Sequence, residues 1–112
     1  MFKEIGQMAS LMNNLPKFRE EIERLQQQIT AEGDAGGGMV KVKVNGKLQL
    51  LSCAISQEAI RPDDKEVLED LIVAATNQAI DKARRTLAEE TTKLAANMGL
   101  PIPPGMSLPG LG

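Results

Sequence analysis

The 112-residue sequence contains no histidine, no tryptophan and no tyrosine, and Cys53 is its only cysteine. Without histidine, the usual proton relays of hydrolases and the commonest metal ligand are both missing. A single cysteine excludes an intramolecular disulfide. No serine nucleophile motif and no carboxylate pair in an obvious cleft take their place. The sequence therefore predicts neither an enzyme nor a protein with a metal, a cofactor or a small-molecule substrate.

Aromatic residues are almost absent, since the chain has only two phenylalanines although 42% of it is hydrophobic. Leucine, isoleucine, valine, alanine and methionine must therefore fill any core. A single β-hairpin is marginally stable in water and needs helices or further strands on its apolar face. Because one copy with one hairpin and two helices would leave much apolar surface wet, we expect an obligate homo-oligomer.

The sequence also lacks a signal peptide, a lipidation motif and an apolar run long enough to span a membrane. These absences predict a cytoplasmic protein without a membrane partner. The formal net charge of -2 does not by itself indicate nucleic-acid binding. Charge is nevertheless segregated along the chain: residues 39–61 hold four basic residues against Glu58 alone, whereas residues 63–70 hold five acids and one lysine.

A hairpin is the strongest local signal in the chain. Three glycines at 36–38 precede valines at 40, 42 and 44 that alternate with Lys41 and Lys43, the period of a strand with one buried face. Asn45-Gly46 predicts a type I′ turn with φ > 0 at both residues. On the return strand the alternation of apolar and polar residues shifts by one position, which predicts a bulge near Leu50-Leu51. Cys53 lies on the apolar phase and is expected to be a small buried hydrophobe.

The first forty residues predict a helix followed by a linker. Apolar residues recur at spacings of three and four. Pro16 interrupts this pattern, so we expect a break or kink at Asn13–Pro16, a short helix before it and a firm helix over about Pro16–Ala31. Residues 32–38 read as a charged, glycine-rich linker. This stretch lacks the Lys-Ser/Thr of a phosphate-binding loop and leads into a strand, which argues against nucleotide binding.

A second, longer helix is predicted after a loop at 56–61, over about Asp64–Asn97. Its early acidic residues are explained by the positive helix N-terminus at least as well as by a metal site. Alanines at 75, 79 and 83 would let a sheet or another helix approach closely. Gly99 ends the helix. We expect a single α–β–α domain over residues 1–98 and a flexible Pro/Gly-rich tail over 99–112.

Three stretches carry a resemblance to a known family: residues 36–47 (GGGMVKVKVNGK), residues 64–79 (DKEVLEDLIVAATNQA) and residues 96–101 (ANMGLP). Together they resemble the YbaB/EbfC family of bacterial nucleoid-associated DNA-binding proteins, over nearly the whole chain. The resemblance implies an α+β fold with an N-terminal helix, an antiparallel hairpin or short sheet and a long C-terminal helix. It also implies an intertwined, tweezer-like homodimer that binds double-stranded DNA with low sequence specificity and acts in nucleoid organisation and gene regulation.

If the chain binds DNA, its helices offer two groups of basic residues. The tweezer shape implied by the resemblance would present the first helix to a duplex, and the second helix has one local excess of positive charge. The candidate DNA-binding residues are Lys17, Arg19 and Arg24 on the first helix and Lys82, Arg84 and Arg85 on the second. We expect Lys41 and Lys43 of the hairpin to contribute less. Two alternatives remain open. These charges are only a solvated face of the helices, or the helical seam, meaning the apolar residues that recur at spacings of three and four along the first helix, docks a partner protein.

Overall fold

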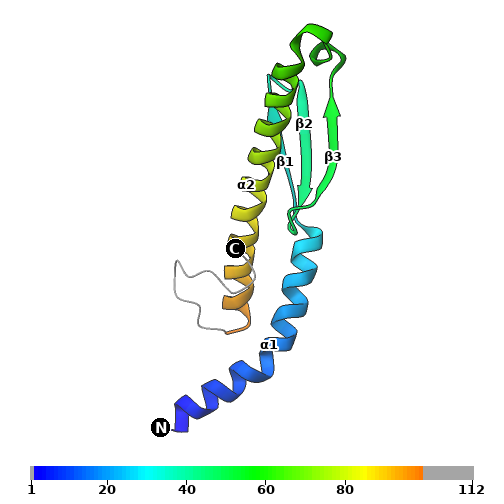
Figure 1. Ribbon diagram of the computed structural model, residues 1–112. Helices are drawn as coiled ribbons and strands as arrows, with labels where there is room; N and C mark the ends of the chain where they lie inside the picture. Colours follow the sequence, from blue (N-terminus) through cyan, green and yellow to red (C-terminus); the bar gives the residue numbers. More distant parts are fainter. Residues whose placement is uncertain (1, 100–112) are drawn as a thin grey trace.

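The computed structural model describes residues 2–99, and side chains within residues 13–61 and 63–99. Helix α1 (Phe2–Gln28) leads into strands β1 (Thr30–Ala35), β2 (Val40–Asn45) and β3 (Leu50–Ile55). Two 3-10 turns, Gln57–Ala59 and Pro62–Asp64, connect the sheet to helix α2 (Lys65–Asn97). The molecule is elongated, with extents of 71 × 22 × 17 Å, and α1 projects beyond the sheet at one end (Figure 1). The predicted α+β fold class is confirmed, and the predicted tail after Gly99 lies outside the described residues.

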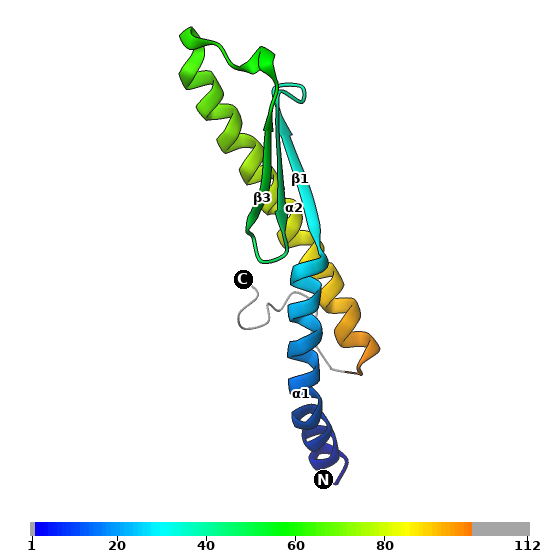
Figure 2. The same ribbon diagram turned by 90° about the vertical axis from the view of Figure 1, so that its right-hand side faces the viewer.

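The three strands form one antiparallel sheet in the order β1-β2-β3. Helix α2 lies along one face of this sheet, over β1 and β2 (Figures 1 and 2). The core consists of three valines of β2 (Val40, Val42 and Val44) and three alanines of α2 (Ala75, Ala79 and Ala83), each almost fully buried. The alternation of valine and lysine along β2 thus sets which face of the sheet is covered, as predicted.

The prediction of a linker over residues 32–38 was wrong, because residues 30–35 form β1. Ala31, Gly33 and Ala35 face the helix and alternate with exposed Thr30, Glu32 and Asp34, so the strand does have the period of two. Its inward residues are too small to register as a hydrophobic run. The three glycines that follow, with φ of 65°, 66° and 92°, form the turn between β1 and β2; such angles are readily available only to glycine.

Gly33 explains why the inward residues of β1 are small. A Cβ atom at this position would lie 2.1 Å from the carbonyl oxygen of Ala75 and 2.6 Å from the backbone nitrogen of Ala79. Strand and helix therefore meet backbone to backbone. The predicted role of the alanines, to permit a close approach to the sheet, is confirmed.

The turn between β2 and β3 differs from the predicted type I′ turn. The amide of Leu48 donates to the carbonyl of Asn45 at 3.0 Å, and the amide of Asn45 donates to the carbonyl of Gln49 at 3.1 Å. Leu48, with φ of 63°, occupies the left-handed region, whereas Gly46 does not. This is a three-residue hairpin loop closed by a left-handed residue. The Asn-Gly pair suggested a glycine needed for its backbone conformation. Gly46 is needed instead because it leaves room for α1, in a contact described below.

Strand β3 confirms one prediction and contradicts another. The register shifts from Lys43↔Ser52 to Val44↔Leu50, which leaves Leu51 as an extra residue at the predicted bulge. Cys53, expected to be buried, is exposed. It pairs with buried Val42 and so shares the covered face of the sheet, but α2 packs over β1 and β2 and leaves this part of the face open.

Helix α1 is one helix with Pro16 inside it, and its axis changes direction partway along (Figure 1). Of the predicted break or kink, the kink is the outcome, as expected for a proline that removes one backbone hydrogen bond. The helix ends at Gln28 and not near Ala31, since the chain from Thr30 onward pairs with β2. Phe18 is 5% exposed and packs with Ala95 of α2, which joins the two helices beyond the sheet.

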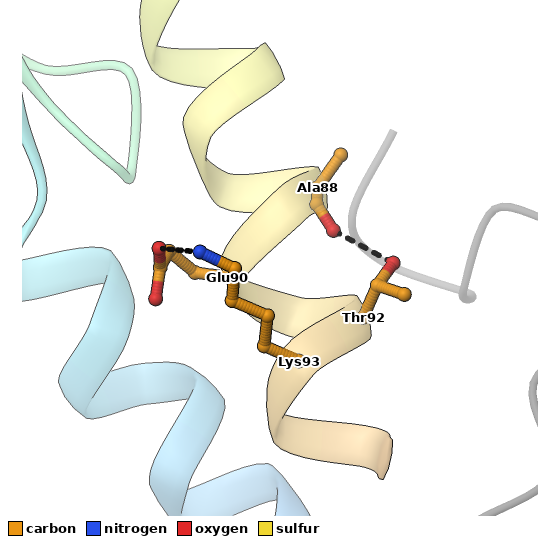
Figure 3. A network of polar contacts seen from close by, with 4 residues as sticks. All are labelled: Ala88, Glu90, Thr92 and Lys93. Atoms are coloured by element: carbon orange, nitrogen blue, oxygen red, sulfur yellow. Dashed lines mark hydrogen bonds and ion pairs between the residues drawn. The ribbon is translucent and has the colours of Figure 1, made fainter.

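Helix α2 follows the prediction closely, beginning at Lys65 with Asp64 as its N-cap residue and ending at Asn97. Gly99, with φ of 70°, closes its C-terminus. Near this end the Thr92 hydroxyl donates to the carbonyl of Ala88 at 2.9 Å, and Lys93 pairs with Glu90 at 3.4 Å (Figure 3). Neither helix has a stretch apolar enough over its described length to cross a membrane.

Candidate nucleic-acid interface

The three candidate basic residues of α1 lie on two sides of the helix. Lys17 and Arg19 are exposed and flank buried Phe18, so at about 100° per residue they project on opposite sides of the face that packs on α2. Arg24 follows Lys17 by seven residues, which places both on the same side. Arg24 forms an ion pair with Glu21. The structure therefore divides the three candidates into Lys17 with Arg24 on one side and Arg19 on the other.

The predicted basic cluster of α2 is divided in the same way. Lys82 and Arg84 flank fully buried Ala83 and project to opposite sides of the line where α2 meets the sheet. Arg85 points to solvent and pairs with Asp81, one turn earlier, with an Nη2–Oδ2 distance of 3.0 Å. Lys82 and Arg85, three residues apart, are therefore neighbours on one side of the helix, and Arg84 lies on the other side.

Four of the six candidates are available for an external anion: Lys17, Arg19, Lys82 and Arg84 have no carboxylate oxygen within 4.0 Å among the described side chains. Arg24 and Arg85 have one each. Both of these pairs are solvent-exposed, and such pairs stabilise by only about 0.2–1 kcal/mol. A phosphate could therefore replace either carboxylate at small cost.

The lysines of β2 are in a different electrostatic environment. The register sets Lys41 opposite Asp34 and Lys43 opposite Glu32 on the uncovered face of the sheet. This face therefore carries a row of acids beside a row of bases and has little net charge. Sequence reasoning missed these acidic partners because it assigned residues 32–38 to a linker. That Lys41 and Lys43 contribute less to DNA binding than the helices do stays a prediction, for which these neighbouring acids give a physical reason.

Acidic residues gather at the other end of the molecule. Asp63, Asp64, Glu66, Glu69 and Asp70 lie at the start of α2, at the end opposite α1 (Figure 1). The candidate basic residues lie on α1 and on the later half of α2. The acidic start of α2 thus lies at the opposite end from α1. Acids also accompany the candidates, however: Glu20, Glu21 and Glu23 on α1, and Asp81, Glu89 and Glu90 on the later half of α2.

Other kinds of site find no support in the part of the chain that the structure describes. It contains no group of three or more His, Cys, Asp or Glu residues that could hold a metal ion. The glycine-rich turn joins two strands, whereas phosphate-binding loops of nucleotide-binding proteins lead into a helix. The fold thus defines an elongated α+β protein whose two long helices carry exposed basic side chains among acidic ones.

Comparisons with known proteins assign the chain to a family. Residues 4–98 match the YbaB/EbfC DNA-binding family, and the chain belongs to this family of nucleoid-associated DNA-binding proteins, which is not a family of enzymes. It is similar to a nucleoid-associated protein of Rhizobium meliloti, with 43% identity over 105 residues that cover 91% of this chain and 96% of the relative. A nucleoid-associated protein of Pelotomaculum thermopropionicum is 38% identical over 99 residues, which cover 86% of this chain and 94% of the relative.

The fold has a counterpart among solved structures. The crystal structure of an uncharacterized protein from Helicobacter pylori matches with a TM-score of 0.61 and 26% sequence identity. The match covers 83% of this chain and 94% of that one. The arrangement of a projecting helix, a three-stranded sheet and a long helix therefore recurs in a related bacterial chain.

Proposed function

We propose that this protein binds double-stranded DNA as a homodimer with low sequence specificity, and that it thereby affects DNA conformation, nucleoid organisation and gene regulation. The observation that carries the proposal is the set of four basic side chains on α1 and α2 without a carboxylate within 4.0 Å among the described residues, in a member of a DNA-binding family. Its place of action would be the nucleoid, in the cytoplasm.

The apolar surface of β3 supports the homodimer. Leu50 and Leu51 are 53% and 51% exposed, and Cys53 beside them is exposed as well. Strand β3 is also an edge of the sheet, so its outer backbone groups are free of a neighbouring strand. Proteins rarely leave an apolar edge strand uncovered. A second copy of the chain is the proposed cover, and its own β3 would present the same surface.

The low sequence specificity is inferred from the kind of contact available. Lysine and arginine side chains on the sides of helices bind phosphate groups, which position a protein on DNA without reading its bases. Dimerisation would double the four available charges. Affinity would then rest on the release of counterions and fall steeply with salt.

The test is a binding titration of a DNA duplex by fluorescence anisotropy at salt concentrations from about 50 to 200 mM, the range over which phosphate-dominated binding weakens most visibly. We expect tight binding at low salt, similar affinity for unrelated sequences, and a linear decline of log K with log salt. Absence of binding at the lowest salt would exclude the proposed function. It would favour the alternative, in which the helical seam docks a partner protein.

A further inference from the structure

The turn between β2 and β3 presents a basic residue that the sequence did not single out. Lys47 is exposed at the tip of this turn, and no carboxylate oxygen lies within 4.0 Å of its ammonium group in the described part of the chain. Unlike Lys41 and Lys43, it has no acid opposite it, because β1 begins at Thr30, the partner of Asn45.

Hydrogen bonds from one buried side chain fix the shape of this turn. Asn45 is 7% exposed, and its Oδ1 accepts from the amides of Lys47 at 2.9 Å and Gln49 at 3.0 Å. Its Nδ2 donates to Oε1 of Gln49 at 2.9 Å. Every polar group of the Asn45 side chain is thus used within the turn, which holds the backbone of Lys47 in one position.

The turn is also fixed against α1. A Cβ atom on Gly46 would lie 2.8 Å from both the Cα and the carbonyl oxygen of Gln26, so the two backbones are in contact. On the other side of Lys47, Leu48 packs against the core between the sheet and α2, in the left-handed conformation described above. Residues on both sides of Lys47 are anchored, and its side chain alone is free.

The contact between Gly46 and Gln26 brings Lys47 to the side of α1 that carries Arg19. Gln26 follows Arg19 by seven residues, which is nearly two turns and about 10 Å along the helix. Arg19 is exposed, and no carboxylate oxygen lies within 4.0 Å of its guanidinium group among the described residues. Glu23 is also exposed and forms no ion pair among the described residues. It lies on the same side of α1, between Arg19 and Gln26. Lys17 and Arg24 project on the other side.

We propose that Lys47 contacts a phosphate of bound DNA together with Arg19, so that the rigid β2–β3 turn and α1 hold the DNA backbone at two points, one on either side of Glu23. This inference rests on the proposed DNA binding. An offset of about 10 Å along α1 corresponds to about three base-pair steps of 3.4 Å along the axis of a DNA duplex. Arg19 and Lys47 would therefore engage the backbone at two separate points and set the angle of α1 to the duplex.

The test compares Lys47→Ala with Lys41→Ala, since both remove one positive charge near the same hairpin. Each variant is titrated with the same DNA duplex over a salt series, and its thermal unfolding is recorded. We expect Lys47→Ala to weaken binding about fivefold at low salt, the order of one or two exposed charge pairs per dimer. The magnitude of its salt slope should fall by about one per bound copy, with an unchanged melting temperature. Lys41→Ala should bind as the unmodified protein does.

Three outcomes separate this inference from the proposed function. If the unmodified protein does not bind DNA, the proposed function itself fails, and this inference with it. If it binds but Lys47→Ala retains both affinity and salt slope, DNA binding stands and the role of Lys47 is refuted. An equal loss in Lys41→Ala and Lys47→Ala also refutes the role, because it would report only a change in the overall charge of the hairpin.

Discussion

Gly33 on β1 and Ala75 on α2 touch through their backbones, since a Cβ atom on Gly33 would stand 2.1 Å from the Ala75 carbonyl oxygen. That contact sets the distance between sheet and helix along the whole core. The valines of β2 reach the alanine stripe of α2 only because β1 carries nothing larger than alanine on its inward side.

Gly33→Ala should therefore destabilise the protein strongly. The added methyl group meets backbone atoms, which cannot rotate away, so strand and helix must separate and the core must loosen. Overpacking of this kind costs about 1–3 kcal/mol and occasionally more. Chemical denaturation measures the loss. Gly37→Ala is the comparison: its Cβ would meet nothing within 4 Å, and it should lose only about 1 kcal/mol for its positive φ.

Gly46→Val should also destabilise the protein, although not for the reason that the Asn-Gly pair suggests. The φ of Gly46 is not positive, and the obstacle is the backbone of Gln26, 2.8 Å from the would-be Cβ. We expect a loss of about 1–3 kcal/mol from this overlap, seen as a lower melting temperature. Gly46→Ala should show most of the same effect, because the overlap involves Cβ itself. A neutral Gly46→Ala would show that α1 can move away from the turn.

The proposed dimer surface on β3 can be tested with two adjacent residues. Cys53 shares the face of buried Val42, whereas Ser52 pairs with Lys43 on the opposite face. A buried, unpaired charge opposes association, so Cys53→Glu should dissociate the dimer into chains of 12.1 kDa at micromolar concentration in sedimentation experiments. Ser52→Glu adds the same charge and should remain dimeric. A monomeric unmodified protein would contradict the homodimer itself.

Much of the fold was predictable because its signals are periodic or local. The valine–lysine alternation of β2, the phase change at Leu50-Leu51 and the length of α2 each follow from one short pattern. β1 was missed because its inward positions hold Ala31, Gly33 and Ala35, whose small size is dictated by a helix more than forty residues away. No local pattern contains that information.

The candidate site was predictable to a smaller degree. Basic residue types could be named from the sequence, but their electrostatic surroundings depend on the fold, which sets Asp34 opposite Lys41 in the sheet and pairs Asp81 with Arg85. The exposure of Cys53 depends on how far α2 extends over the sheet. The position of Lys47 beside α1 depends on the contact between Gly46 and Gln26, which joins residues twenty positions apart.

The six candidate residues on the helices are compared with the β2 lysines through double variants. Arg19→Ala/Arg24→Ala and Arg84→Ala/Arg85→Ala remove charge from α1 and α2, and Lys41→Ala/Lys43→Ala removes the same amount from the sheet. Single variants at Lys17 and Lys82 complete the set. We expect each helix variant to weaken binding to all sequences alike, because the contacts are to phosphates. The sheet variant should have little effect, since Asp34 and Glu32 face these lysines.

The central claim, that the helices bind DNA through its phosphates, is tested most directly by the salt slope of these three double variants on one duplex. The account predicts a linear fall of log K with log salt for the unmodified protein. It also predicts a slope reduced by about one per contact in each bound copy for both helix variants, and an unchanged slope for Lys41→Ala/Lys43→Ala. A slope lowered only in the sheet variant would place the binding surface on the sheet and contradict the claim.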